Sequence, residues 1–215
     1  MNAGSGARGA TVGLGLWAGA VAVAAVLLTG CSSGESGLDG PPRLPSITVG
    51  SGQSAENRVL AEIYAGVLRG TGSPVETRLD LAPGEDLAEL DSGAVTLVPE
   101  YTGRLLERLH PGAAETEPDA VFEELNRSLP AGLSVSDYGM AQEPGSGDAG
   151  EAGSSVPAQN VVPLMRSGVL TEAQVKALNV VAGELTSAEL AQMGESVRSG
   201  ERTADRAAAD WLGAR

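Results

Sequence analysis

Cysteine and histidine are almost absent from this sequence of 215 residues, which contains one of each, Cys31 and His110. A single cysteine forms no intramolecular disulfide and no thiolate metal cluster. A histidine metal site or a catalytic triad would have to rely on His110, which precedes a proline in a polar stretch and has no flanking motif of a hydrolase family. We therefore expect a protein that is not an enzyme, with no metal site and no bound cofactor, and we interpret His110 as a surface residue.

Aromatic residues and positive charge are also scarce. The sequence has one Phe, three Tyr and two Trp, and its 14 basic residues are outnumbered by 28 acidic ones, for a net charge of −14. Such a surface repels DNA and RNA, so a nucleic-acid partner is not expected. Neighbouring acids such as Glu123 and Glu124 are more typical of a solvated face than of a general acid.

The first thirty residues have the pattern of an export signal. Arg8 precedes an uncharged stretch, residues 11–28, and the segment ends in Leu28-Thr-Gly-Cys31. A positive n-region, an apolar h-region and small residues before a cleavage site are typical of a secretory signal peptide. The final four residues resemble a bacterial lipobox, which implies a diacylglyceryl lipid on Cys31 and an anchor in the cell membrane, on its extracytoplasmic face. The alternative is an uncleaved transmembrane helix, since about 20 apolar residues can span a bilayer.

Composition divides the chain into five segments. After the signal peptide, residues 1–30, a Gly/Ser/Pro-rich tether is predicted over residues 31–45. Residues 46–142 are predicted to form the first part of a folded lobe. Residues 143–157 have no apolar pattern and are predicted to be a flexible linker. Residues 158–215 are then expected to supply a returning strand and the C-terminal helices of the same lobe.

Hydrophobic periodicity predicts alternating strands and helices. Strands are expected at 46–50, 75–81, 94–98, 133–138 and 160–165; Pro99 is expected to end the third, and Pro163 suggests a strand edge or end. Helices are expected at 54–69, 85–90, 101–109 and 118–129, followed by three that begin near Thr171, Thr186 and Thr203. This α/β pattern predicts a mostly parallel sheet flanked by helices on both faces.

Two loops follow predicted strands, at positions where α/β sheets bind ligands. Gly50-Ser-Gly-Gln-Ser-Ala55 opens a helix, whose first N–H groups attract anions. The same spacing fits a dinucleotide fingerprint, for which an exported chain has little use, so a carboxylate site and a simple tight turn stay open as alternatives. Pro99-Glu-Tyr-Thr-Gly103 offers Tyr101 either as an aromatic face for a cation or as cover for the sheet edge.

Several stretches resemble the substrate-binding proteins of osmoprotectant ABC importers, which bind glycine betaine, choline, carnitine or proline betaine. They are ITVGSGQSAENRVLAEIYAGVL, VETRLDL, ELDSGAVTLVPEYTGRLL and PAQNVVPLMRSGVLTEAQVKALNVVAGELTSAELAQM. The resemblance covers residues 46–142 and 157–212. It implies a periplasmic-binding-protein-like (type II) fold, a betaine or other quaternary ammonium ligand, ABC permease subunits as partners, and the membrane as the site of anchoring.

The sequence departs from this family in three places. Family members clamp the ligand between two lobes, whereas only the linker stands where a second lobe would begin, so a single lobe is expected. Gly52 replaces a lysine that is common in the family, and Arg104 replaces the last threonine of its Y-T-G-T pattern. The ligand-binding residues that the resemblance implies are Tyr101, Thr102, Ser51, Gln53 and Ser54, with Tyr138 as a weaker candidate.

Two functions are therefore considered. The first is a membrane-anchored solute-binding protein, or a truncated relative of one, that serves an importer of quaternary amines. The second is a ligand-free lipoprotein, derived from such a protein, that makes protein contacts at the cell surface. One cation–π contact contributes roughly 0.5–2 kcal/mol, and micromolar binding needs about 8 kcal/mol. The missing lobe and Gly52 therefore favour the second function, and the intact PEYTG motif favours the first.

Overall fold

The computed structural model describes residues 46–143 and 157–215; the predicted signal peptide, Cys31 and most of the linker lie outside these ranges. The strands of the described residues are Ile47–Gly50 (β1), Val75–Arg78 (β2), Leu97–Tyr101 (β3), Leu133–Val135 (β4) and Val161–Arg166 (β5). The helices are Ala55–Gly70 (α1), Glu85–Ser92 (α2), Thr102–Leu109 (α3), Pro118–Ser128 (α4), Glu172–Glu184 (α5), Ser187–Arg198 (α6) and Ala204–Gly213 (α7). Every expected element is present, although β2 and β4 are shorter than the sequence suggested.

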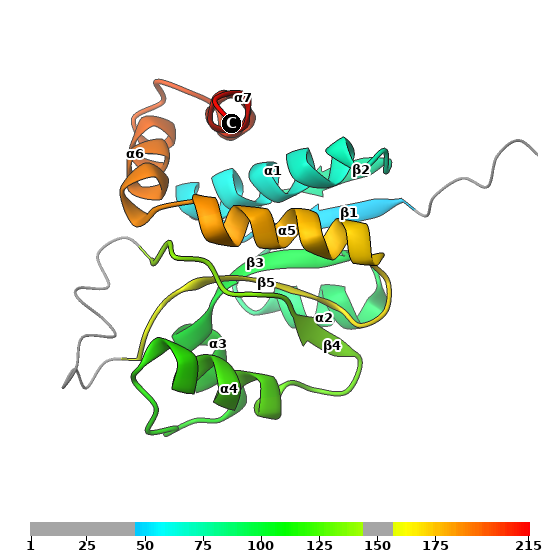
Figure 1. The fold of residues 1–215 in the computed structure, drawn as a ribbon, viewed down its shortest axis with the longest axis vertical. Helices are drawn as coiled ribbons and strands as arrows, with labels where there is room; N and C mark the ends of the chain where they lie inside the picture. The colour runs from blue at the N-terminus through cyan, green and yellow to red at the C-terminus, as the bar shows by residue number, and fades with distance from the viewer. Residues whose placement is uncertain (1–45, 144–156) are drawn as a thin grey trace, which may run out of the picture. The chain divides into compact units, whose positions relative to one another are not determined.

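A five-stranded sheet in the order β2-β1-β3-β5-β4 forms the centre of the lobe (Figure 1). β1 pairs in parallel with β2 and β3, whereas β5 runs antiparallel to both of its neighbours, β3 and β4. Strands β1, β2, β3 and β4 therefore point the same way, and the expectation of a mostly parallel sheet flanked by helices is confirmed. The sheet contains strands from both sides of the linker.

The prediction that Pro99 ends the third strand is wrong, because β3 continues to Tyr101. Pro99 lies directly opposite Pro163 in the ladder between β3 and β5. Opposite residues in an antiparallel pair alternate between hydrogen-bonded and non-hydrogen-bonded positions, and only the second kind suits two residues without an N–H. β4 pairs with β5 only as far as Leu164. Pro163 therefore has no strand on its other side, which is why a strand inside the sheet tolerates it.

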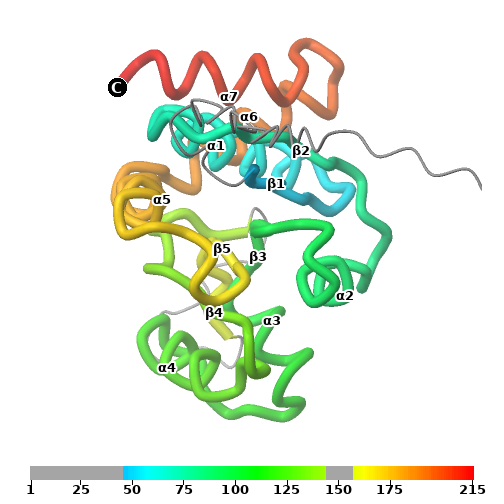
Figure 2. The backbone as a smooth tube through the Cα atoms, turned by 90° about the vertical axis from the view of Figure 1, so that its right-hand side faces the viewer, coloured from blue at the N-terminus to red at the C-terminus, as the bar shows by residue number. Residues whose placement is uncertain are grey.

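Helices cover both faces of the sheet and bury two apolar clusters. One cluster lies between the sheet and helices α1, α5, α6 and α7, and the other lies between the sheet and helices α2, α3 and α4. Figure 2 shows α7 and α4 at opposite ends of the described unit. Residues alternate across a strand, so Leu97 and Tyr101 of β3 belong to the first cluster and Val98 to the second. The same alternation directs Glu100 toward α2 and α3.

Side-chain caps begin several helices where the sequence predicts them. The hydroxyl of Ser54 accepts a hydrogen bond from the N–H of Asn57 at 3.1 Å and starts α1. Thr171 and Thr186 form capping boxes at the starts of α5 and α6. Such caps pair N–H groups that have no acceptor inside the helix, and each typically contributes about 1 kcal/mol.

The segment that follows the linker docks against the start of α3. The Thr102 N–H donates to the Asn160 carbonyl at 2.9 Å, and the Thr102 hydroxyl donates to the Ala158 carbonyl at 2.9 Å. A Cβ on Gly103 would come within 2.7 Å of that Ala158 oxygen. Only glycine permits so close an approach of two backbones. The last two residues of the PEYTG motif therefore join the two halves of the lobe.

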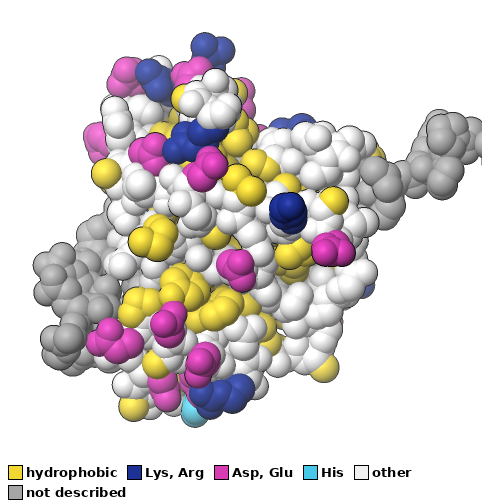
Figure 3. All heavy atoms as spheres, viewed as in Figure 1, with side chains coloured by type: hydrophobic (Ala, Val, Ile, Leu, Met, Phe, Trp, Pro, Cys, Tyr) yellow, Lys and Arg dark blue, Asp and Glu magenta, His cyan; other side chains and the backbone are white. Residues whose placement is uncertain are grey.

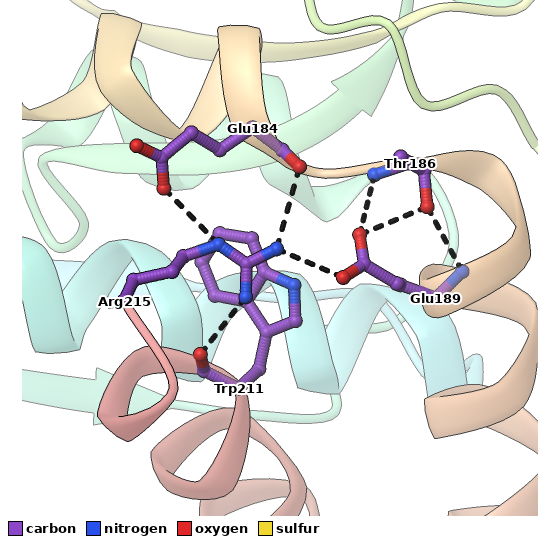
Figure 4. A network of polar contacts seen from close by, with 5 residues as sticks. All are labelled: Glu184, Thr186, Glu189, Trp211 and Arg215. Carbon is purple, nitrogen blue, oxygen red and sulfur yellow. Dashed lines mark hydrogen bonds and ion pairs between the residues drawn. The ribbon is translucent and has the colours of Figure 1, made fainter.

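Arg215 holds the end of α7 against α5 and α6 (Figure 4). Its guanidinium donates to the carbonyls of Trp211 and Glu184 and pairs with the carboxylates of Glu184 and Glu189. The guanidinium carbon also lies 3.6 Å from the centroid of the Trp211 ring. Glu189 also closes the capping box with Thr186. The Arg215 side chain therefore ties the last turn of α7 to the first turn of α6.

The surface of the lobe is mixed in character. Figure 3 shows acidic and basic side chains interspersed with apolar ones on the face seen in Figure 1. Among the residues that the structure describes, two large apolar side chains, Met140 and Val180, are exposed. Within residues 46–143 and 157–215, no helix is both long enough and apolar enough to cross a bilayer.

We predict that cleavage within residues 144–156 leaves the two fragments associated. β5 forms ladders with β3 and β4 and buries Val162 and Leu164, so the fragments separate only if both ladders break. A protease site inserted in this stretch of the full chain, followed by native size-exclusion chromatography, tests the prediction. Separate elution of the fragments without denaturant would contradict a single continuous lobe.

Candidate functional site

A cavity of about 410 Å³ opens beside the carboxyl ends of β1 and β3. Its lining comes from the turn between β1 and α1, from the loop that includes Leu81 to Gly84, and from the end of β3 with the adjoining α3. Open α/β sheets bind ligands at this edge, outside the carboxyl ends of their strands. We therefore take this cavity as the candidate site in the described part of the chain.

Three charged side chains from three elements meet in the cavity lining. Arg108 of α3 donates two hydrogen bonds to Asp86 of α2, at 3.0 and 2.8 Å, and one to Glu100 of β3, at 3.2 Å. Asp86 and Glu100 are 9% and 8% exposed. Two carboxyl groups thus share one guanidinium, and the cluster carries one excess negative charge when both are ionised.

Glu100 is poised to gain or lose its proton near neutral pH. Burial raises the pKa of Glu100 to about 7, and the nearby carboxylate of Asp86 adds to the effect, while Arg108 and Arg104 oppose it. The ionised form loses its hydration on burial and is repelled by the second carboxylate, which is why the proton is held. A cation that enters the cavity would favour the ionised form of Glu100.

The start of α1 contributes a different kind of surface to the cavity. Its first-turn N–H groups have no acceptors inside the helix and carry partial positive charge, which favours an anionic group. Of the predicted ligand residues in this turn, Gln53 alone lines the cavity. Ser51 is fully buried, with its hydroxyl donating to the Gly52 carbonyl at 2.9 Å, and Ser54 caps the helix.

The structure places Tyr101 on the opposite face of β3 from Glu100. The ring is 2% exposed and packs in the apolar cluster beneath α1. Its burial raises the pKa of the Tyr101 phenol. The guanidinium of Arg104 lies over the ring, 5.3 Å from its centroid. The ring is therefore not part of the cavity lining, and a ligand-binding role for Tyr101 stays a prediction.

Thr102 and Tyr138 also lie outside the cavity lining. Thr102 is 1% exposed, and its hydroxyl is engaged by the returning segment. The Tyr138 ring packs on Phe122, with 5.0 Å between centroids, and its hydroxyl donates to Asp119 at 2.5 Å. The structure does not bring Tyr138 to the turn that holds Gln53, and the proposed ligand contacts of Thr102 and Tyr138 stay predictions.

Sequence reasoning missed the Asp86, Glu100 and Arg108 cluster. One signal was available, because Glu100 stands within a strand whose other residues are all apolar or aromatic, LVPEY. A carboxylate in a buried strand needs a partner, since an unpaired buried charge is strongly destabilising. The partner itself had no local signal, because Arg108 reaches Glu100 only through the packing of α3 on the sheet.

Other candidate sites are weaker. A cavity of about 490 Å³ lies between α6 and α7 and is lined by Trp211 and Arg215, but the Arg215 guanidinium already covers the indole ring. His110 is exposed, as expected, and its Nδ1 lies 2.8 Å from an oxygen of Glu124. Within the described ranges, no group of three or more His, Cys, Asp or Glu side chains is arranged to hold a metal ion.

Comparisons with known proteins agree with the fold. The family model for the substrate-binding domain of an ABC-type glycine betaine transport system matches residues 45–145 and 150–214. Apo YehZ from Escherichia coli is 17% identical with a TM-score of 0.65, over 78% of this chain and 98% of that chain. A structure described as a glycine betaine/carnitine/choline ABC transporter is 10% identical with a TM-score of 0.65, over 79% and 97% of the two chains. No curated protein sequence matches.

We predict that Glu100→Gln changes how stability depends on pH. Because the folded-state pKa of Glu100 is raised from 4.5 to about 7, its contribution to stability is present below pH 4.5 and is lost as pH rises to about 7. Glutamine does not ionise, so the variant does not lose this stability. Its free energy of unfolding, relative to that of wild type, should therefore rise by roughly 2 kcal/mol from pH 5 to pH 8. Urea unfolding of both proteins at the two pH values measures the difference. Glu124→Gln controls for the loss of another buried, ion-paired carboxyl group. The prediction is contradicted if the stability difference between Glu100→Gln and wild type is the same at pH 5 and at pH 8.

Proposed function

The chain belongs to the family of substrate-binding domains of ABC-type glycine betaine transport systems, and we propose that it is the solute-binding component of an importer for glycine betaine or related amines. The observation that carries this proposal is the cavity beside the carboxyl ends of β1 and β3, which lies within the residues matched by the family model. Its partners would be the permease subunits of that importer.

The charges around the cavity suit a zwitterion. The N-terminus of α1 provides positive potential for a ligand carboxylate, and the guanidinium of Arg104, which also pairs with Glu143, adds a hydrogen-bond donor. Asp86 and Glu100 provide negative potential for a ligand ammonium, with Arg108 compensating one of the two charges. A small molecule with a carboxylate at one end and an ammonium at the other therefore finds both of its charges complemented.

A single lobe limits the affinity that this site can reach. High-affinity pockets bury 70–90% of a small ligand, whereas an open cavity on one lobe leaves one side of the ligand in water. Residues 144–156 are far fewer than the roughly 50 residues of the smallest common domains, so they do not supply a second lobe. We therefore expect a dissociation constant of roughly 0.1–1 mM for the isolated chain.

Anchoring to the membrane through Cys31 forms part of the proposal. It rests on the sequence from Leu28 to Cys31 and on the uncharged stretch before it. A lipid on Cys31 would hold the lobe near the permease on the extracytoplasmic face, with residues 32–45 as the tether. At that short range, the local concentration of the lobe offsets part of its modest affinity for partners.

We predict that the full chain, purified in detergent, binds glycine betaine or a close analogue, and that Arg104→Gln weakens binding about tenfold or more. A hydrogen bond to a charged group contributes about 1.5–3 kcal/mol, and Arg104 is half-exposed, so its loss should spare the fold. Isothermal titration calorimetry measures both proteins. Arg127→Gln is the matched control, because Arg127 pairs with Glu124 away from the cavity.

Tyr101→Ala would be a poor test, since removing a buried aromatic ring costs about 3–5 kcal/mol of stability. Absence of heat from a folded protein with every ligand would contradict solute binding and favour the protein-contact function.

We predict that the chain incorporates labelled palmitate in a bacterium that processes lipoproteins, and that Cys31→Ser does not. The wild-type protein should also lack residues 1–30 in its intact mass, because cleavage follows lipidation, whereas the variant should retain them. Ser33→Ala is the control and should behave as wild type. An unlabelled wild-type protein that retains residues 1–30 would instead indicate an uncleaved transmembrane helix.

A further inference from the structure

No aromatic side chain lines the candidate cavity in the described part of the chain. Quaternary ammonium groups have no N–H bonds, and proteins hold them mainly against the faces of aromatic rings. The aromatic residues nearest in sequence to the lining, Tyr101 and Tyr64, are both 2% exposed and belong to the apolar cluster on the other side of β3. The cavity therefore lacks the aromatic surface that typically holds a fully methylated ammonium.

The Tyr101 ring is already in contact with a cation of the chain itself. The Arg104 guanidinium lies 5.3 Å from the ring centroid, within the usual range of a cation–π contact. Arg104 is also held by an ion pair with Glu143. A ligand ammonium would have to displace this guanidinium before it could use the ring.

Hydrogen-bond acceptors are plentiful in the same lining. Asp86 and Glu100 contribute carboxyl groups that are 9% and 8% exposed and share the single guanidinium of Arg108. Asn57 also lines the cavity, but its Oδ1 is fully buried, so a ligand in the cavity does not reach that oxygen. The two carboxyl groups call for a ligand that brings N–H donors.

We propose that this cavity recognises a small zwitterion whose ammonium group retains N–H bonds, in preference to a fully methylated one such as glycine betaine. The inference rests on the proposed solute-binding function and specifies the ligand class. The N-terminus of α1 and Arg104 take the carboxylate, and the carboxyl groups of Asp86 and Glu100 take the N–H donors. Each methyl group added to the ammonium removes one donor and enlarges the charged end, so affinity falls along the series.

The test is a titration of the full chain, in detergent, with glycine, sarcosine, dimethylglycine and glycine betaine. These four ligands share one carboxylate and one positive charge and differ only in the methylation of the nitrogen. Calorimetry at one pH and salt concentration should give dissociation constants that rise along the series, with glycine at least tenfold tighter than glycine betaine.

Two variants connect the preference to the cavity. Glu100→Gln and Asp86→Asn should each reduce the ratio of the glycine betaine to the glycine dissociation constant by at least threefold, while the control Glu124→Gln leaves it unchanged. Circular dichroism and urea unfolding confirm that each variant is folded.

The outcomes separate this inference from the proposed function. Equal or tighter binding of glycine betaine in the wild-type chain overturns the inference and leaves solute binding in place. A preference for glycine that survives both variants also overturns it, because the preference then arises elsewhere. Failure of all four ligands to bind a folded chain overturns the inference together with the proposed function.

Discussion

The antiparallel ladder between β3 and β5 is the interaction on which the rest of the lobe depends. It joins residues on either side of the linker and places Pro99 against Pro163, in a register that needs no N–H from either residue. That register also brings Ala158 and Asn160 against the start of α3. There they form hydrogen bonds with Thr102, and Ala158 packs closely on Gly103. The identities of Thr102 and Gly103 are thus explained by packing and hydrogen bonding alone, whether or not they also touch a ligand.

Because residues alternate along β3, one face of the strand packs in the core and the other face lines the cavity. Tyr101 completes the apolar cluster under α1, while Glu100 on the other face meets Asp86 and Arg108 at the cavity. Burying a carboxyl group beside another is unfavourable for folding unless a cation compensates, and one guanidinium compensates two carboxyls only in part. Burial and the incomplete compensation raise the pKa of Glu100, an effect found both at binding sites and in structural ion-pair networks.

Membership of a glycine betaine transport family and the chemistry of this particular cavity are different kinds of information. The family model identifies the lobe and its ancestry, whereas the lining decides what the lobe can hold. A fold hosts many sites, so the ligand must be argued from the side chains present. Here those side chains are carboxyl groups, guanidinium groups, two amides and several aliphatic groups, without an aromatic ring. The proposal that the cavity prefers a ligand with N–H donors therefore rests on these side chains and not on the family.

The sequence by itself determined the order of strands and helices, the side-chain caps of α1, α5 and α6, and the family, because these depend on local periodicity, on side chains next to the helix start and on short motifs. The cap expected from Thr203 does not form at α7. The sequence also predicted the edge of the sheet beside which the cavity opens, through the turn that contains Gln53. The tertiary structure alone decided that β3 runs through Pro99, since only the proline opposite it on β5 makes that position suitable. It likewise decided that Tyr101 faces the core and that Arg108 joins Asp86 to Glu100, because strand register and helix packing bring together residues that no local pattern connects.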